Sequence, residues 1–405
     1  MLDFRFSDHP MNRSPDHPIA KTVSNLRYLC LIVVLAGWLT VSGQPRWTTN
    51  LTEAHGLQPF DRPTQLLWSK QQGVVFIAPD RLAVYQVNEL RSLAPLAKRD
   101  SSGGAGNFVL NLKILDTHDG HEIKSMRFPT SGSFSQIAAV RGGNFLVRTG
   151  DVLYLFSPAF KVLASKALLL DRVAPFEEWQ VHTSRSGAEI VLVHQLLFIH
   201  ESVLADGTLL SPGKSNADVE ILDADTLKVV KAFSLPNYLA YWSAGDGFVV
   251  GTHPSQPHHA EEFGILNFDG EWKQLKPPFK TKNRCLSVMD ALDLHLIAAY
   301  GCNGVVAFSE SGEQVFHSYG RVNESPVGVA NSGNYFAVEF FYLPDIHNSQ
   351  SRGRPSHLDL FDLKGGSRLI SLSLQTSTVY YDVSAQGLLA VVEGDTLRMF
   401  ALGNE

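Results

Sequence analysis

Short runs that alternate apolar and polar residues dominate the chain beyond about residue 60. Examples are "GVVFIAP", "DVLYLFSP", "AEIVLVHQ" and "GLLAVVEG", each bounded by turn residues such as Gly, Asp, Ser or Pro. β-Branched and aromatic residues at a period of two, between turn residues, are typical of β-strands. Only 87–100 has a pattern suited to a short helix, and Pro95 interrupts it. The sequence therefore predicts an all-β fold.

One hairpin pattern recurs along the chain. A strand end, a turn rich in Asp, Ser or Gly and a second strand occur at 114–123, 155–164, 221–230, 265–274, 307–316 and 360–369. The base spacing is about 40 residues, which fits four strands per repeat, as in the blades of a β-propeller. Each recurring hairpin then joins the third strand of a blade to the fourth. The predicted blades span about 73–128, 135–168, 178–235, 238–276, 284–317 and 326–374.

The last repeat supplies only three strands before the sequence ends. A spare strand near the start, "PTQLLWSK" at 63–70, would complete that repeat and close the ring, which removes two exposed sheet edges. Seven blades result, with six or eight as open alternatives because some repeats carry long insertions. We expect a seven-bladed β-propeller of four-stranded antiparallel blades at 63–403, its N-terminal strand completing the last blade, with a linker at 44–62.

The recurring turns also carry a resemblance to a known group. The strings "LDTHDG", "LDADT", "NFDG" and "SESG" resemble the turns of seven-bladed propellers of the YVTN and quinoprotein amine dehydrogenase-like group, and more loosely those of WD-repeat proteins. The chain has no Trp-Asp dipeptide closing a third strand, no "YVTN" string and no Trp-rich quinone-enzyme repeat. The resemblance implies a propeller fold and a binding platform, and it disfavours a quinone-dependent enzyme.

The first 43 residues have the pattern of a secretory signal peptide. Lys21 and Arg27 precede an uncharged apolar run at about 29–41, and Val41 and Gly43 are small enough for a cleavage site. The apolar run is short for a bilayer span, which needs about 20 residues. We expect a secreted or periplasmic protein. The alternative is that the segment is retained as a membrane anchor.

Cys285 and Cys302 are the cysteines that remain after cleavage of such a leader. The stretch between them reads as strand, turn and strand, and a hairpin centred between residues 293 and 294 would place them opposite each other. In an oxidising compartment this favours a disulfide between Cys285 and Cys302. Two buried free thiols are the alternative.

The charge balance bears on the class of partner. The net charge is -6, with 34 Lys and Arg against 40 Asp and Glu, and no basic stripe is present. Proteins that bind nucleic acid usually carry such a stripe, so we expect no nucleic-acid partner. Nothing in the pattern calls for an oligomer, and we expect a monomer.

Long insertions at 88–107, 201–217, 253–261 and 343–356 all interrupt predicted connections between the second and third strands of a blade. These connections share one face of a propeller, and long loops on a rigid scaffold often carry binding sites. One insertion offers imidazole and carboxylate metal ligands, namely His253, His258, His259 and Glu261. Another holds candidates for contact with an anionic ligand or partner, namely Asp345, His347, Arg352, Arg354 and His357. A solvated loop is the alternative for each insertion.

No catalytic motif is visible in the sequence. It lacks a G-x-S-x-G elbow, an H-E-x-x-H helix and a Gly-rich phosphate loop. We therefore expect an exported propeller that is not an enzyme and binds a protein, peptide or glycan, without a cofactor. The alternative is a metal-dependent hydrolase or lactonase with a divalent ion at the channel mouth. Two carboxylates and a His within ligand distance there would favour the enzyme; aliphatic and Ser or Thr residues would favour binding.

Overall fold

The computed structural model describes most of residues 44–402. The chain divides into two compact units, Met1–Ser42 and Gly43–Glu405, and every described residue belongs to the second unit. The residues left undescribed between 44 and 402 are 61–71, 90–107, 131–134, 169–176, 185, 197–201, 204–208, 211–215, 237, 241–246, 253–262, 268–270, 276–277, 279–287, 302–303, 321–323, 343–353 and 377–378.

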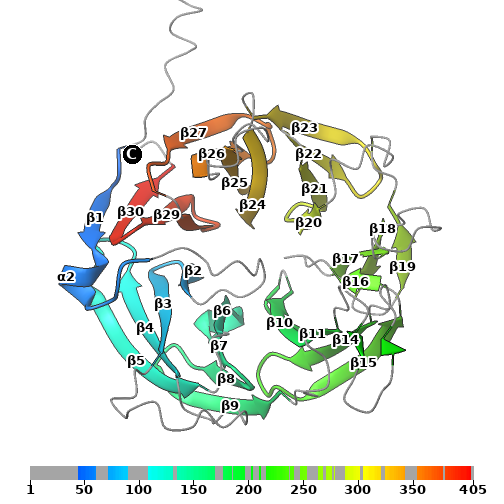
Figure 1. Ribbon diagram of the computed structural model, residues 1–405, viewed down its shortest axis with the longest axis horizontal. Coiled ribbons are helices and arrows are strands. Elements are labelled where there is room, and N and C mark those ends of the chain that lie inside the picture. Colours follow the sequence, from blue (N-terminus) through cyan, green and yellow to red (C-terminus); the bar gives the residue numbers. More distant parts are fainter. Residues whose placement is uncertain are drawn as a thin grey trace, which may run out of the picture. The chain divides into compact units, whose positions relative to one another are not determined.

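The described residues form seven four-stranded antiparallel sheets, which are the blades of a β-propeller. In each blade the strands a, b, c and d run in order from the inside of the ring to its rim (Figure 1). Blades 1 to 4 comprise, in the order a to d, β2 (Gln72–Ala78), β3 (Arg81–Glu89), β4 (Phe108–Asp116) and β5 (Glu122–Thr130); β6 (Ser135–Ala139), β7 (Phe145–Thr149), β8 (Val152–Phe156) and β9 (Val162–Ala167); β10 (Glu177–Thr183), β11 (Glu189–Leu196), β14 (Asn216–Asp223) and β15 (Val229–Pro236); and β16 (Tyr238–Ala240), β17 (Gly247–Thr252), β18 (Phe263–Asn267) and β19 (Trp272–Gln274).

The remaining blades confirm the predicted count of seven. All of the recurring hairpins join strand c to strand d, as the turn pattern predicts. A small extra hairpin, β12 (Ser202–Val203) with β13 (Leu209–Leu210), lies within the b–c connection of blade 3. Blades 5 to 7 comprise β20 (Val288–Leu292), β21 (Leu296–Gly301), β22 (Gly304–Ser309) and β23 (Gln314–Tyr319); β24 (Glu324–Ser332), β25 (Tyr335–Tyr342), β26 (Arg354–Asp362) and β27 (Arg368–Ser373); and β28 (Val379–Val383), β29 (Leu388–Glu393), β30 (Thr396–Ala401) and, from the start of the chain, β1 (Trp47–Asn50).

The strand that closes the ring comes from the N-terminal side, as predicted, but it is β1 and not 63–70. β1 pairs antiparallel with β30, with Trp47 opposite Met399 and Asn50 opposite Thr396. The segment predicted as a linker therefore contributes the d strand of blade 7. The predicted strand at 63–70 lies outside the described residues.

A short helix, α2 (Leu51–His55), follows β1 and anchors it. Asn50 caps the helix, because its side-chain oxygen accepts the N–H groups of Thr52 and Glu53 at 2.9 and 3.0 Å. The helix residue Leu51, with Leu57 and Phe60 after the helix, is buried in a cluster with apolar residues of blade 7 and blade 1. The N-terminal segment thus seals the junction between the last blade and the first.

The hydrophobic core is divided among the junctions between neighbouring blades. Separate clusters join blades 1 and 2, 2 and 3, 5 and 6, 6 and 7, and 7 and 1. A blade covered on both faces buries both sides of its middle strands, and in β7 all five residues are buried. This explains why many b strands read as continuous apolar runs rather than strict alternation.

The hairpin between Cys285 and Cys302 has its turn centred half a residue away from the predicted position. Val288 pairs with Tyr300 and Leu292 with Leu296, so the turn is centred on Leu294 rather than between residues 293 and 294. The turn is made by residues with positive φ, 62° at Leu294 and 57° at His295. Cys285 and Cys302 lie outside the described residues, so their pairing remains a prediction.

The N-terminal 43 residues also lie outside the described part, and the signal peptide at 1–43 remains a prediction. In the described part of the chain no helix has both the length and the apolar character needed to cross a membrane.

His55 at the sealed junction gives a prediction about pH. The side chain is only 5% exposed, its Nδ1 lies 3.5 Å from Glu122 Oε2, and Lys113 pairs with the same carboxylate. Burial lowers the pKa of His55 below 6.5. As the pH falls below 6.5, His55 becomes protonated in the unfolded chain, whereas burial opposes its protonation in the folded protein. The free energy of unfolding therefore decreases with falling pH until the pH reaches the pKa of His55 in the folded protein.

We expect the melting temperature of the wild type to decline more steeply than that of the His55→Gln variant when the pH is lowered from 7.5 to 5.5. Scanning calorimetry of both proteins across this range measures the difference. Parallel curves would show that His55 does not control this part of the pH dependence.

Candidate functional site

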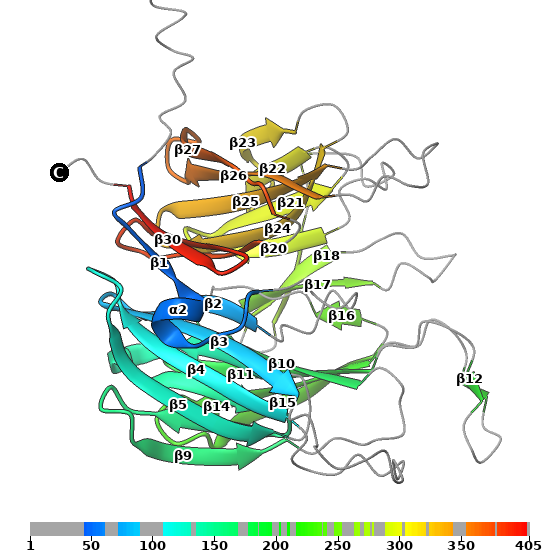
Figure 2. The ribbon, with the colours of Figure 1, turned by 60° about the vertical axis from the view of Figure 1, so that its left-hand side comes forward.

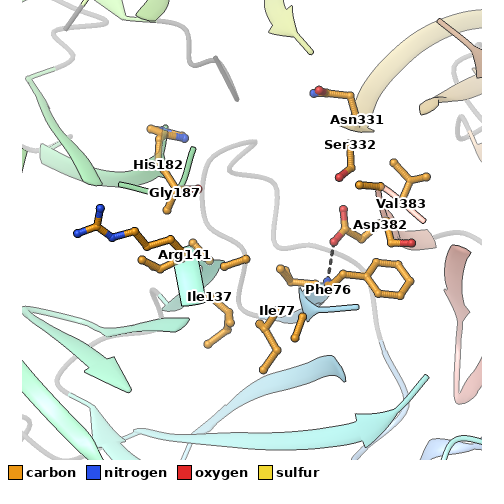
Figure 3. A pocket seen from close by; sticks show the side chains of 18 of the residues that line it. Phe76, Ile77, Ile137, Arg141, His182, Gly187, Asn331, Ser332, Asp382 and Val383 are labelled. Atoms are coloured by element: carbon orange, nitrogen blue, oxygen red, sulfur yellow. Dashed lines mark hydrogen bonds between the residues drawn. The ribbon is translucent and has the colours of Figure 1, made fainter. Parts of the chain in front are cut away.

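The candidate site is a cavity of about 550 Å³ on the axis of the ring. Its described walls come from strands β2, β6, β10, β24 and β28 and from a–b turns, including the turn between β20 and β21 (Figure 3). Strand a is the innermost strand of each blade, so segments far apart in the sequence face one another here. A preformed concave site on a rigid scaffold is a common setting for ligand binding.

The cavity lies at the end of the axis where the a–b turns are. Its lining includes the strand ends and following turns at 75–79, 181–184 and 382–386. The a–b and c–d turns share this face because successive strands of a blade run in opposite directions. The b–c connections, including hairpin β12–β13 (Figure 2), belong to the opposite face.

The long insertions do interrupt b–c connections, between β3 and β4, β11 and β14, β17 and β18, and β25 and β26. Their position in the blades is therefore as predicted. Most of their residues lie outside the described part, so their role as a binding face remains a prediction. The residues that line the cavity were not predicted from the sequence, and they belong to the other face.

The walls of the cavity are mainly aliphatic and small polar. Aliphatic side chains come from every described strand of the lining, and hydroxyl groups come from the a–b turns of blades 3 and 7. Representative residues are Val75, Ile137, Val383, Thr183, Ser184 and Ser384. The lining also contains the imidazole of His182 and the carboxylates of Asp293 and Asp382.

A glutamine joins two blades at the cavity wall. Gln136 in β6 accepts the backbone N–H of Val181 in β10 at 3.0 Å and donates to the Val181 carbonyl at 2.5 Å. Its side-chain amide therefore pairs with the neighbouring strand much as a backbone amide would. This fixes the inner edges of blades 2 and 3 relative to each other.

Two aspartates make similar links elsewhere on the wall. Asp382 in β28 accepts the backbone N–H of Phe76 in β2 at 2.7 Å, which ties blade 7 to blade 1 (Figure 3). Asp293, in the a–b turn of blade 5, accepts the N–H of Gly333 at 2.5 Å, while its own N–H donates to Asn331 Oδ1 at 3.1 Å. Both carboxylates line the cavity and are held by the adjacent blade.

Arg141 is a positively charged residue of the described cavity lining, and its guanidinium pairs with a carboxylate in another turn. Its guanidinium forms an ion pair with Asp225 in the c–d turn of blade 3, with Nε also 3.4 Å from Asp225 Oδ1. The Asp225 carboxylate raises the pKa of Arg141 above its usual value. Figure 3 shows the guanidinium on the far side of the cavity from Asp382.

The residues predicted from the insertions are mostly outside the described part. This holds for His253, His258, His259, Glu261, Asp345, His347 and Arg352. Arg354 is the first residue of β26, so its backbone belongs to a strand rather than to a loop.

His357 also lies in β26, inside blade 6, and not in the loop where the sequence placed it. Its side chain is 9% exposed and stacks on Phe340 with ring centroids 4.5 Å apart. Glu324 Oε1 lies 3.5 Å from its Nδ1, and Asp359 Oδ2 lies 3.7 Å from its Nε2. These contacts hold the blade together.

One group of metal-type ligands occurs among the described residues. Donor atoms of Asp116, Asp119 and His121 lie within 4.8 Å of one another in the exposed c–d turn of blade 1. Asp119 accepts the backbone N–H of His121 at 3.0 Å and contacts its Nδ1 at 2.7 Å, which lowers the pKa of Asp119 and raises that of His121. The turn geometry accounts for these residues. Within the described lining of the cavity, no such group is found.

Comparisons with known proteins inform the fold alone. No protein-family model matches the chain, and no curated protein matches it. Solved structures do match. An acylaminoacyl peptidase in complex with Z-Gly-Gly-Phe-chloromethyl ketone has 12% identity and a TM-score of 0.51, covering 83% of this chain and 53% of that one. The orthorhombic form of the Pyrococcus horikoshii acylaminoacyl peptidase has 12% identity and a TM-score of 0.50, covering 83% and 54%.

The chain is a β-propeller. It spans about half the length of the peptidase structures that it matches. The propeller domain of the Trilobed protease from Pyrococcus furiosus also matches, with 12% identity, a TM-score of 0.49 and coverage of 83% of this chain and 97% of that one. At such low identity the likeness to the two peptidase structures establishes the architecture and not an activity. The resemblance to the YVTN group remains a prediction.

Proposed function

We propose that this protein is an exported binding scaffold that takes a segment of a polypeptide into its axial cavity. The observation that carries the proposal is the composition of the cavity wall, where aliphatic surface alternates with hydroxyl, amide and carboxylate groups on fixed strands. Such walls suit a peptide, which presents apolar side chains together with amide donors and acceptors.

The rigidity of the site supports binding. Side chains at the wall pair with the neighbouring blade through Gln136, Asp293 and Asp382. A site held in this way loses little conformational entropy when it is filled. The metal-dependent hydrolase gains no support from the described lining, because its carboxylates and imidazole do not form a group of donor atoms within ligand distance.

The test is a selection of random hexapeptides displayed on phage against the purified full-length protein, followed by measurement of affinity for the selected peptides. The site is then filled by Ser332→Trp, at a half-buried position on the cavity wall. The matched control is Ser373→Trp, at an exposed position on strand β27 of the same blade.

We expect Ser332→Trp to weaken binding of the selected peptides at least tenfold and Ser373→Trp to leave it unchanged. Thermal unfolding of both variants establishes that they are folded. Failure to select any peptide, or equal binding by the wild type and Ser332→Trp, would remove the proposal.

A further inference from the structure

We infer that the cavity binds its polypeptide in an extended form, with the main chain of the ligand paired to the inner edge of strand β10 at Thr183. This inference rests on the proposed function and adds the conformation and the chemical group that are recognised, a main-chain amide rather than a particular side chain. It follows from the way in which a side-chain amide of the protein already occupies the neighbouring position of that edge.

The pairing of β10 with β11 directs the main-chain groups of Thr183 toward the inside of the ring. Thr183 lies opposite Ile190, and the next residue, Ser184, donates its N–H to the Glu189 carbonyl at 2.9 Å. In an antiparallel pair, residues that bond the partner strand alternate with residues whose N–H and C=O point away from it. Since Ser184 bonds to the β11 side, the N–H and C=O of Thr183 point to the opposite side.

Val181, two residues earlier in β10, agrees with this alternation. Its N–H and C=O both pair with the side-chain amide of Gln136 in β6, at 3.0 and 2.5 Å. Residues two apart in a strand direct their main-chain groups to the same edge, so Val181 and Thr183 share the inner edge of β10. The Gln136 amide therefore occupies the position next to Thr183 much as a residue of an added strand would.

Thr183 is the next position along this edge, and it lines the cavity as a partly buried residue. Among the described residues, none forms a hydrogen bond with its N–H or C=O on the inner side. A ligand that covers Thr183 must satisfy both groups, because main-chain N–H and C=O are obligatory hydrogen-bonding groups. An extended residue does so with its own C=O and N–H, as in the addition of a strand to a sheet edge.

The end of β10 is held in place where this pairing would occur. The Ser184 hydroxyl accepts the N–H of Glu189 at 3.1 Å and lies 3.1 Å from the hydroxyl of Ser186. Gly187, in the same turn, donates its N–H to the Ser184 carbonyl at 2.8 Å, and its carbonyl accepts the N–H of Arg141 from blade 2 at 3.2 Å (Figure 3). An edge that is fixed in this way loses little conformational entropy when a ligand pairs with it.

Hydrogen exchange tests the pairing in the full-length wild-type protein. Exchange of individual amides into heavy water is followed by NMR, with and without a saturating concentration of a hexapeptide selected on phage. We expect the Thr183 amide to exchange at least tenfold more slowly when the peptide is bound. The Ser184 amide, which already donates to the Glu189 carbonyl, is the internal control and should change by less than twofold. Unchanged exchange at Thr183, or equal slowing at both residues, would overturn the inference.

Thr183→Pro tests the same bond by removing the N–H of Thr183. Proline is tolerated where a strand N–H does not face a partner strand, and here that N–H faces away from β11. We expect at least a tenfold loss of affinity for the selected peptides. The matched control is Ser373→Pro at the end of rim strand β27, because Leu374 donates to the Ser356 carbonyl and Ser373 therefore points outward. It should leave the affinity unchanged.

Thermal unfolding establishes that both proline variants are folded, and equal affinity of the two folded variants would contradict the inference. If Thr183→Pro does not fold, the exchange measurement on the wild type decides. If hexapeptides bind in a manner that Ser332→Trp blocks but exchange at Thr183 does not slow, the extended pairing is wrong and the scaffold stands. If no peptide of any kind binds, both proposals fail.

Discussion

Removing residues 1–60 is expected to leave a protein that no longer folds stably. The deletion strips β1 from β30, which leaves the backbone edge of β30 exposed. It also removes Leu51, Leu57 and Phe60 from the cluster between blades 7 and 1. Loss of a buried Leu or Phe side chain costs about 2–5 kcal/mol. Three such losses approach or exceed the whole stability of a typical protein, about 5–15 kcal/mol.

The comparison is a deletion of residues 1–43 only, which leaves β1 and α2 in place. Size-exclusion chromatography and thermal unfolding followed by circular dichroism measure the result. We expect the shorter deletion to be soluble and to unfold cooperatively, and the longer one to aggregate or to show no transition. Similar melting temperatures for the two proteins would mean that β1 and α2 do not close the ring.

Replacing Arg148 by Ala is expected to have the second largest effect on stability. Arg148 lies in β7 of blade 2 and is 5% exposed. Its Nη1 donates to the carbonyl of Trp179 in strand a of blade 3, and its Nε donates to the carbonyl of Gly150 at 3.1 Å. The substitution removes both bonds and the buried stem, so we expect a loss of about 3–5 kcal/mol.

Urea unfolding of Arg148→Ala and of Arg127→Ala gives the measurement and its control. Arg127 is exposed on the rim strand β5, where loss of a side chain usually changes stability by about 0.5 kcal/mol or less. If both variants lost the same small amount, Arg148 would not be a link between blades 2 and 3.

The repeat architecture could be predicted from sequence because it is set locally. The c–d turns need Asp, Asn, Ser or Gly in particular places, as at Asp223, whose carboxylate accepts from Thr226 at 2.6 Å. Similar strings therefore recur wherever that hairpin is made. The closing strand could not be located in this way, because "WTTN" at 47–50 is short and lacks apolar alternation. Its pairing with β30 is fixed by contacts hundreds of residues away in sequence.

The residues of the cavity were missed for a related reason. Asp293 and Asp382 are far apart in the chain and line one cavity only because the ring brings their strand ends to one axis. A weak signal was present, since each is a polar residue at or just after the end of an innermost strand, in "VMDALD" and "TVYYDVS". The b–c insertions were conspicuous in the sequence because they are long. Their length indicates that a longer surface loop costs little stability as much as it indicates a function.

The central claim is that the ligand enters the cavity on the a–b face. Photo-crosslinking tests it most directly, with benzoylphenylalanine placed either at position 332 on the cavity wall or at position 203 in the b–c hairpin β12–β13. Each protein is irradiated with a selected hexapeptide, and the adduct is measured by mass spectrometry. We predict an adduct at position 332 and none at position 203. An adduct at 203 with none at 332 would contradict the account and would indicate that the ligand binds on the opposite face.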